Sequence, residues 1–262
     1  MGRTALITGG SMGIGKELAR IHAERGGDLV IVARSEGKLN GLAKELESRH
    51  SVNVHIITKD LTVEGATREV YNEIKSNNIE INYLINNAGF GGYGKFHERE
   101  WENDLAMINL NIVALTALTR FFVPDFVSRG SGKILNISSI ASLLPGPLQT
   151  IYFATKAYVT SFSNAIAEEL RGTGVTVTAL LPGPTETGFA HTSGLDKTSL
   201  FDKTANARDV ALKGYEGMIL GKLNVITGVA FVQRMLLNMI PFVPKKMVLK
   251  QMSKMQKMSP SL

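Results

Sequence analysis

The 262-residue sequence predicts an α/β fold with a doubly wound parallel sheet. Six short apolar segments rich in branched residues recur along the chain, and longer segments of helical periodicity separate them. The apolar segments are residues 5–8, 29–33, 52–58, 83–86, 133–137 and 175–181. Buried strands that alternate with helices indicate right-handed crossovers and helices on both faces of the sheet. Because a Gly-rich turn follows the first segment directly, the pattern predicts a Rossmann-type sheet.

Length and composition are those of a single intracellular domain. An α/β fold of this size often forms one unit, so we expect residues 1–262 to be one domain. The chain has no cysteine, which excludes disulfides and thiolate metal sites and favours a reducing compartment. The N-terminus passes directly into the apolar residues 5–7, leaving no room for a signal peptide. We therefore expect a cytoplasmic protein.

Two regions after Pro182 differ from the rest of the chain. Residues 183–206 are rich in Gly, Thr, Ser and Asp with little periodicity, which predicts a mobile flap over the substrate, followed by a helix from about Ala207. Residues 229–258 are predicted to form a basic helical extension. Residues 1–216 carry a net charge of −1, whereas residues 217–262 hold seven basic and no acidic side chains. The excess positive charge therefore lies entirely in the tail.

The Gly-rich turn predicts a dinucleotide site. A turn of this kind between a strand and a helix lets the backbone approach a pyrophosphate, whose charge is met by amide groups at the helix N-terminus. Gly9, Gly13 and Gly15 stand in this context. The candidate contacts in the turn are Gly9, Ser11, Met12, Gly13 and Ile14.

Arg34 predicts which dinucleotide binds. In dinucleotide folds an acidic residue about 20 positions after the glycines binds the ribose hydroxyls. Here Arg34 stands 19 residues after Gly15. A guanidinium binds the 2′-phosphate of NADP, which an acid would repel, so we expect NADPH to be preferred over NADH. Lys38, one helical turn later, adds a second cation or is a solvated lysine.

Two further loops follow strands at the sheet edge where open α/β folds bind ligands. Asp60 and Leu61 follow the third predicted strand, and Asn87, Ala88 and Gly89 follow the fourth. All five are candidate cofactor contacts. By itself Asp60 fits equally a turn or cap before a helix predicted to begin near Thr62.

Two Tyr-x-x-x-Lys pairs compete for the role of proton donor. Tyr152 and Lys156 lie in the first turns of a helix predicted from about Thr150, close to the cofactor edge. In the second pair, Tyr71 lies about nine residues into the helix expected near Thr62, ~13 Å from that edge, and Lys75 lies one turn further on. We therefore assign the chemistry to Tyr152 and Lys156 and expect the other pair to form a solvated helix face.

The spacing of the first pair explains its chemistry. Residues four apart share one helix face, which places the Lys156 ammonium beside the Tyr152 hydroxyl and a bound ribose. A nearby cation is expected to lower the tyrosine pKa toward the working pH. Ser139, thirteen residues before Tyr152, would hydrogen-bond the substrate oxygen. Tyr152 and Lys156 thus count as both catalytic and cofactor-binding residues of a carbonyl reductase.

Taken together, these motifs resemble those of the short-chain dehydrogenase/reductase family over roughly residues 3–190. The resemblance implies a seven-stranded sheet, commonly assembled into homodimers or homotetramers. It assigns the catalytic Asn to Asn111, thirteen residues before Pro124, rather than to Asn109. It also assigns the catalytic Ser to Ser139 rather than Ser138. Finally, it places three residues against the nicotinamide, namely Pro182, Gly183 and Thr187.

The substrate prediction rests on apolar residues near these motifs. These residues are 143–145, Phe90, Phe153 and Phe189. They favour a lipophilic substrate, either a ketone, steroid-like or otherwise, or a 3-oxoacyl thioester. The alternative is that several of them belong to the core. Oxidation of the corresponding alcohol or hydroxysteroid is the related alternative. A non-catalytic NADPH-binding sensor or scaffold is the alternative from another class.

The tail leaves several partners open. Val248, Met252 and Met255 recur at helical spacing among lysines. The pattern fits packing within the protein or against a subunit, an anionic membrane surface, or an acidic acyl carrier or coenzyme A thioester. Residues 229–243 are interrupted by Arg234 and Pro241 and are too short for a membrane span. Nothing beyond charge predicts nucleic-acid binding.

Overall fold

The computed structural model describes residues 3–195 and 203–256 and confirms the predicted doubly wound sheet. Seven parallel strands lie in the order β3-β2-β1-β4-β5-β6-β7. Their bounds are β1 Ala5–Thr8, β2 Leu29–Ala33, β3 Val54–Thr58, β4 Tyr83–Asn86, β5 Gly132–Ile137, β6 Val175–Pro182 and β7 Asn224–Thr227. The apolar segments predicted the first six strands. The sequence pattern missed β7, which is four residues long and only partly buried at the sheet edge.

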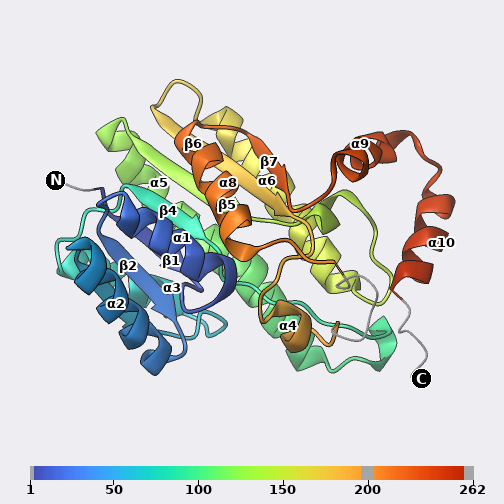
Figure 1. Ribbon diagram of the computed structural model, residues 1–262, viewed down its shortest axis with the longest axis horizontal. Helices are drawn as coiled ribbons and strands as arrows, with labels where there is room; N and C mark the ends of the chain where they lie inside the picture. The colour runs from blue at the N-terminus through green and yellow to red at the C-terminus, as the bar shows by residue number, and fades with distance from the viewer. Residues whose placement is uncertain (1–2, 196–202, 257–262) are drawn as a thin grey trace.

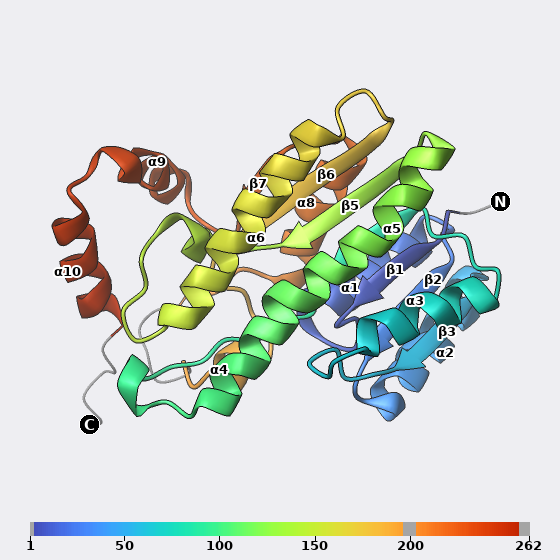
Figure 2. The ribbon, with the colours of Figure 1, turned by 180° about the vertical axis from the view of Figure 1, so that it is seen from behind.

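Helices cover both faces of the sheet (Figures 1 and 2). One face is covered by α1 Gly13–Glu24, α2 Glu36–His50 and α8 Ala207–Ile219. The other is covered by α3 Ala66–Ser76, α5 Leu115–Arg129 and α6 Thr150–Glu169. Each group of helices contributes buried aliphatic residues to a core against the sheet. Strands buried on both sides explain why their sequences read as continuous apolar runs.

A long helical run precedes β5. It consists of α4 Trp101–Ile108, a π-helical segment Asn109–Ala114 and α5. Among the described residues this run alone is long and apolar enough to cross a membrane by length and composition. Three residues of α5 are buried in the core, namely Leu118, Phe122 and Phe126. Figure 2 shows α5 lying along the sheet. The α5 part of the run is therefore a core helix.

The third helix begins later than its sequence pattern predicted. We expected it near Thr62, but α3 starts at Ala66. The Asp60 carboxylate accepts hydrogen bonds from the backbone N–H of Thr62, at 2.9 Å, and from its hydroxyl, at 2.8 Å. This Asx turn, followed by the left-handed Gly65, holds the intervening residues outside the helix.

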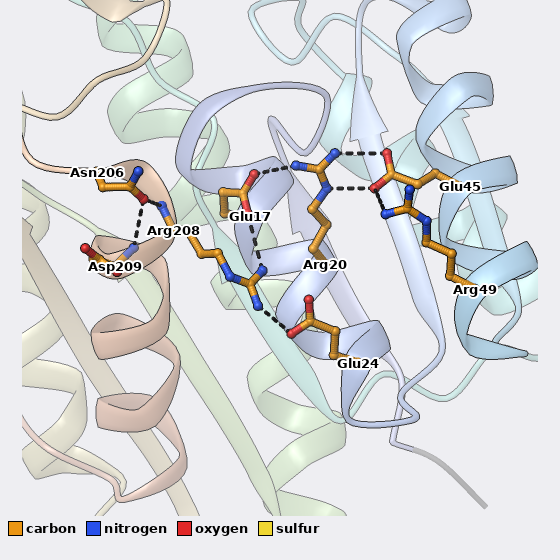
Figure 3. Close-up of polar contacts among 8 residues, drawn as sticks. All are labelled: Glu17, Arg20, Glu24, Glu45, Arg49, Asn206, Arg208 and Asp209. Atoms are coloured by element: carbon orange, nitrogen blue, oxygen red, sulfur yellow. Dashed lines mark hydrogen bonds and ion pairs between the residues drawn. The ribbon is translucent and has the colours of Figure 1, made fainter.

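Ion pairs join α8 to α1 and α1 to α2 (Figure 3). Arg208, in the first turn of α8, contacts Glu24 at 2.7 Å and Glu17 at 3.6 Å on α1. Arg20 bonds Glu17 and, through two nitrogens, Glu45 on α2. Glu17, Glu24 and Glu45 are all paired, so α8 is held against the helix that begins at the Gly-rich turn.

The C-terminal residues form helices that project beyond the sheet (Figures 1 and 2). They comprise α9 Phe231–Met239, a 3₁₀ turn Ile240–Phe242 and α10 Lys245–Met255. Within the predicted flap, 183–206, the structure shows the short helix α7 Phe189–Thr192 and a bridge between Thr185 and Ala205. Residues 196–202 of the flap and residues 257–258 of the predicted extension lie outside the described residues.

Candidate active site

Hydrogen bonds link the Gly-rich turn to the loop after β4. The Thr8 hydroxyl accepts from the backbone N–H groups of Asn87 and Ala88, each at 3.0 Å. The Asn87 amide donates to the carbonyl oxygens of Thr8 and Gly9. Gly9 has a φ of +66°, and a Cβ there would lie 2.9 Å from the Cα of Ala88. The two loops can approach this closely only because position 9 is glycine.

The N-terminus of α1 is built to receive an anion. Met12, the residue before the helix, has an extended backbone and caps no amide with its side chain. The first turn holds no acidic residue, so no side chain there offsets the positive end of the helix dipole. This end of the helix lies at the cavity described below. These features fit the pyrophosphate of a dinucleotide. Four residues of this turn line the cavity, namely Ser11, Met12, Gly13 and Ile14.

Cations gather at the ends of β2 and β3. Arg34 is 77% exposed at its side chain and lies 3.8 Å from the Asp60 carboxylate. Asp60 thus serves in the turn to Thr62 and also faces Arg34. Its pKa is lowered by the hydrogen bonds from Thr62 and by Arg34, which outweigh burial. Lys38 and Lys59 line the same end of the cavity, and Lys59 was missed by the sequence reading.

The four predicted catalytic residues converge at the carboxyl end of the sheet. Ser139 follows β5, and its hydroxyl accepts from the backbone N–H of Ala141 at 3.1 Å. That hydroxyl also hydrogen-bonds with the Tyr152 hydroxyl in the first turn of α6. Lys156 is buried one turn later, with its Nζ 5.8 Å from the centre of the Tyr152 ring. Ser139, Tyr152 and Lys156 all line the cavity.

The structure distinguishes the rival serine and asparagine. Ser138 turns away from Ser139 and bonds the carbonyl of Lys156 and the hydroxyl of Thr160, both on α6. Asn111 lies in the π-helical segment, a distortion often found at functional sites. Its amide donates to the carbonyl of Phe90 and to the hydroxyl of Thr155. Asn111 thus lies behind the cavity wall.

Gly89 lies between Asn111 and Lys156. A Cβ at position 89 would lie 2.9 Å from the Asn111 Oδ1 and 3.5 Å from the Lys156 Nζ. Asn109, by contrast, points to the backbone of Thr62. Only Asn111 of the two asparagines is therefore adjacent to Lys156.

The pKa of Tyr152 differs from the sequence expectation. Burial of the phenol end raises the pKa of Tyr152 to about 12, despite the hydrogen bond with Ser139. The sequence predicted that Lys156 lowers the pKa of Tyr152, and this prediction is wrong. The Lys156 ammonium donates to the Ile137 carbonyl at 2.8 Å and lies beneath the tyrosine ring. Tyr152 is therefore a neutral phenol at neutral pH, the form that donates a proton.

Burial also lowers the pKa of Lys156 to about 8. At neutral pH the folded protein thus holds a charged lysine in a poorly solvated place, at a cost in stability. Because the folded pKa lies below the unfolded value, this cost is fully present below about pH 8 and disappears as the pH rises toward the unfolded pKa, ~10.4.

We expect Lys156→Met to raise the free energy of unfolding near neutral pH by about 1–2 kcal/mol. The estimate subtracts about 1 kcal/mol for the lost bond to Ile137 from about 3 kcal/mol of desolvation. Urea unfolding at neutral pH and near pH ~10 measures the effect, which should shrink at the higher pH. Lys75→Met, at an exposed lysine, is the control and should change stability little. A destabilised Lys156→Met protein at neutral pH contradicts the argument.

The second pair, Tyr71 and Lys75, lies outside this site. Both side chains contact the Asp125 carboxylate on α5, at 3.3 and 3.2 Å. The prediction of a solvated face is wrong for Tyr71, whose ring packs edge-on against Phe122 with centroids 5.1 Å apart. It is correct for Lys75, which is exposed. This pair ties α3 to α5.

One cavity of about 1720 Å³ unites the predicted cofactor residues. It exceeds the ~300–1,000 Å³ of common ligand pockets and so has room for a dinucleotide together with a second molecule. Besides the residues already placed, it is lined by Leu61, Ala88, Gly89, Pro182, Gly183 and Thr187. Asn87 and Gly9 also line it.

Apolar residues line the part of the cavity beside Tyr152. Leu144, Phe153 and Phe189 belong to this lining, as expected, and the Phe189 ring lies 5.2 Å from that of Tyr152 between centroids. Leu143, Pro145 and Phe90, also expected there, are absent from the lining that the described residues form.

The C-terminal helices pack within the protein, one of the alternatives that the sequence left open, and they also supply a wall of the cavity, which the sequence did not predict. Met252 of α10 is buried against Phe153 and Ala141, and Val248 packs on the same cluster. The Tyr93 hydroxyl donates to the carbonyl of Gln256 at 2.7 Å and so holds the end of α10. The helical spacing of Val248 and Met252 was the available signal. The wall also includes Leu236, Leu237, Ile240, Val243, Met247, Gln251 and Met255.

Comparisons with known proteins bear on this site. Residues 3–198 match the family model of short chain dehydrogenases. The very-long-chain 3-oxoacyl-CoA reductase of Mus musculus is 36% identical over 188 residues, 70% of this chain and 59% of the mouse protein. This chain thus spans less than two thirds of that relative.

Solved structures match nearly the whole chain. A short-chain dehydrogenase from Sphingobium yanoikuyae in complex with NADPH is 31% identical, with a TM-score of 0.83 over 99% of this chain and 98% of that one. The bulky-bulky ketone specific alcohol dehydrogenase from Comamonas testosteroni is 30% identical, with a TM-score of 0.78 over 99% and 97%.

Proposed function

This chain belongs to the short-chain dehydrogenase family, and from that membership we propose that it reduces the carbonyl of a lipophilic substrate with NADPH. The family makes it an oxidoreductase that acts on carbonyl or hydroxyl groups with a nicotinamide cofactor. The proposed substrate is a bulky ketone or a 3-oxoacyl thioester, and the product is the alcohol. The observation that carries the proposal is the Ser139–Tyr152 hydroxyl pair facing an apolar cavity, with Lys156 buried beneath it.

In the proposed mechanism, the chain's own residues supply the proton and stabilise the oxygen. NADPH, when bound, would supply the hydride. Ser139 and Tyr152 donate hydrogen bonds to the carbonyl oxygen, where negative charge grows in the transition state. Tyr152 then gives up its proton as a general acid, for which its neutral phenol is suited. Lys156 adds positive charge nearby, and Asn111 holds the Phe90 backbone behind Gly89.

Cofactor preference is proposed from charge at the ribose end. Arg34 is exposed, follows β2 directly and lines the cavity together with Lys38 and Lys59. These three cations suit a 2′-phosphate, which only NADP carries. The Sphingobium relative was solved with NADPH, which supports the same choice.

The apolar wall supports a lipophilic substrate. Phe153, Phe189 and Met252 surround the side of the cavity next to Tyr152. The mouse relative is a 3-oxoacyl-CoA reductase and the Comamonas enzyme is specific for bulky ketones, and substrates of both kinds agree with an apolar cavity of this size. We also propose that the chain is one domain with a flap at 183–206 and a cavity-closing extension at 229–258. As in much of the family, we propose a cytoplasmic homodimer or homotetramer.

A substrate panel tests the function. We expect NADPH consumption with bulky ketones, steroid ketones and 3-oxoacyl thioesters, but little with small polar ketones, because the wall is mostly apolar and favours apolar substrates. NADH is run beside NADPH. Binding of NADPH without turnover of any substrate in the panel would instead favour the hypothesis of a non-catalytic sensor or scaffold.

A further inference from the structure

The C-terminal helices present an exposed apolar surface. We call it the C-terminal face and define it by six side chains of α9, the 3₁₀ turn and α10, each more than half exposed: Val232, Met235, Leu236, Met239, Phe242 and Met247. Phe242, at 79%, is the most exposed large apolar side chain among the described residues. Figures 1 and 2 show that α9 and α10 stand out from the body of the fold.

Unpaired cations surround this face. Arg234 lies on α9, and four lysines lie on α10, namely Lys245, Lys246, Lys250 and Lys254. The salt bridges of the described residues include none of these five. The contrast is the cluster in Figure 3, where Arg20 and Arg208 are each paired with two acids. Because residues 217–262 hold no acidic side chain, the face is complementary to an anionic surface.

The cavity reaches the same face. Leu236 and Met247 line the cavity and are also more than half exposed, and Met255, which lines the cavity too, is 41% exposed. Residues that line a cavity from inside while remaining exposed outside mark its opening. The apolar cavity therefore opens within or beside the C-terminal face.

We propose that the C-terminal face docks on the surface of an anionic membrane, with the cavity opening toward the lipid. Flexible Met and Leu side chains with a Phe among them, flanked by lysines, form the pattern of helices that lie in a membrane interface. Burial of the apolar side chains and attraction of the lysines to anionic headgroups act together.

A second copy of the chain is a poorer occupant of this face. A two-fold symmetric contact would place the same patch against itself. The lysines of α10 would then face the lysines of the other α10 with no acid nearby to offset the repulsion. A bilayer containing anionic lipid supplies both the apolar layer and the negative charge.

Vesicle sedimentation tests the docking without requiring activity. We expect the full-length protein to bind vesicles of phosphatidylcholine mixed with phosphatidylglycerol and not vesicles of phosphatidylcholine alone. Met239→Asp with Phe242→Asp should weaken binding at least ~10-fold, because two apolar side chains are lost from the interface. Lys245→Glu with Lys246→Glu should weaken it about 30-fold, a loss that high salt should reproduce in the unaltered protein.

Matched controls separate docking from folding. None of Met239, Phe242, Lys245 and Lys246 lines the cavity, so these variants should keep the turnover of a soluble substrate. Leu220→Asp alters an equally exposed apolar residue outside the face and should leave vesicle binding unchanged. Phe242→Trp in a Trp101→Phe background gives a single tryptophan, whose emission should shift to the blue on anionic vesicles.

Four outcomes overturn the proposal. One is failure of the unaltered protein to sediment with anionic vesicles. Another is equal binding to neutral and anionic vesicles, which removes the role of the lysines. The third is vesicle binding that survives both double variants. The fourth is a change in oligomer size of these variants, measured by sedimentation velocity, without a loss of vesicle binding, which would make the face a subunit contact. Because vesicle binding needs no turnover, failure of the reductase proposal leaves this test unaffected.

Discussion

Tyr152→Phe should lower the rate of carbonyl reduction by about 10²–10⁴-fold, the usual contribution of a general acid. The phenol has a pKa of about 12 and therefore carries its proton throughout the physiological range. Phenylalanine keeps the ring and its packing against Phe153 and Phe189, so only the proton donor is lost. Steady-state consumption of NADPH measures the loss, and equilibrium titration should show NADPH affinity largely retained.

The second Tyr-x-x-x-Lys pair supplies the matched control. Tyr71→Phe removes one hydroxyl from the same motif, but that hydroxyl donates to Asp125 on α5, outside the active site. We expect unchanged turnover and a loss of unfolding free energy of at most about 1 kcal/mol. Turnover that survives Tyr152→Phe, or falls equally in both variants, would contradict the assignment of Tyr152.

Arg34→Asp should weaken NADPH binding about 100-fold while changing NADH binding little. The estimate combines the loss of charge-assisted bonds, about 1.5–3 kcal/mol, with repulsion between the new carboxylate and the 2′-phosphate. Arg34 projects from the end of β2 with its side chain largely exposed, so the exchange should not disturb the core. Titration of both cofactors, with kcat/KM for each, measures the change in preference.

Two further variants locate the charge effect. Arg49→Asp changes an exposed arginine at the other end of α2 and should leave both cofactors unaffected. Lys38→Asp tests the second cation at the ribose end, where a fall in NADPH affinity alone would make it a phosphate contact. Equal losses of NADPH and NADH in Arg34→Asp would refute the phosphate role of Arg34.

The sheet and most of the cofactor edge could be predicted from the sequence because their signals are local. A buried strand followed by Gly9, Gly13 and Gly15 specifies a tight turn into a helix wherever it occurs. A parallel sheet then brings the ends of its strands to one edge, which is why Arg34, Asp60 and Gly89 line one cavity. Among the described strands only β7 escaped, since it is four residues long and contains just two apolar residues, Val225 and Ile226.

The sequence by itself determined the fold class, the Gly-rich turn between β1 and α1, and a shared helix face for Tyr152 and Lys156. These follow from strand alternation and from the helical repeat, which need no knowledge of distant residues. The tertiary structure alone decided that Lys156 bonds Ile137 beneath the Tyr152 ring and that burial raises the tyrosine pKa. It alone also placed Met252 against Phe153, about a hundred residues away in the chain, because desolvation and long-range packing depend on which segments meet in space.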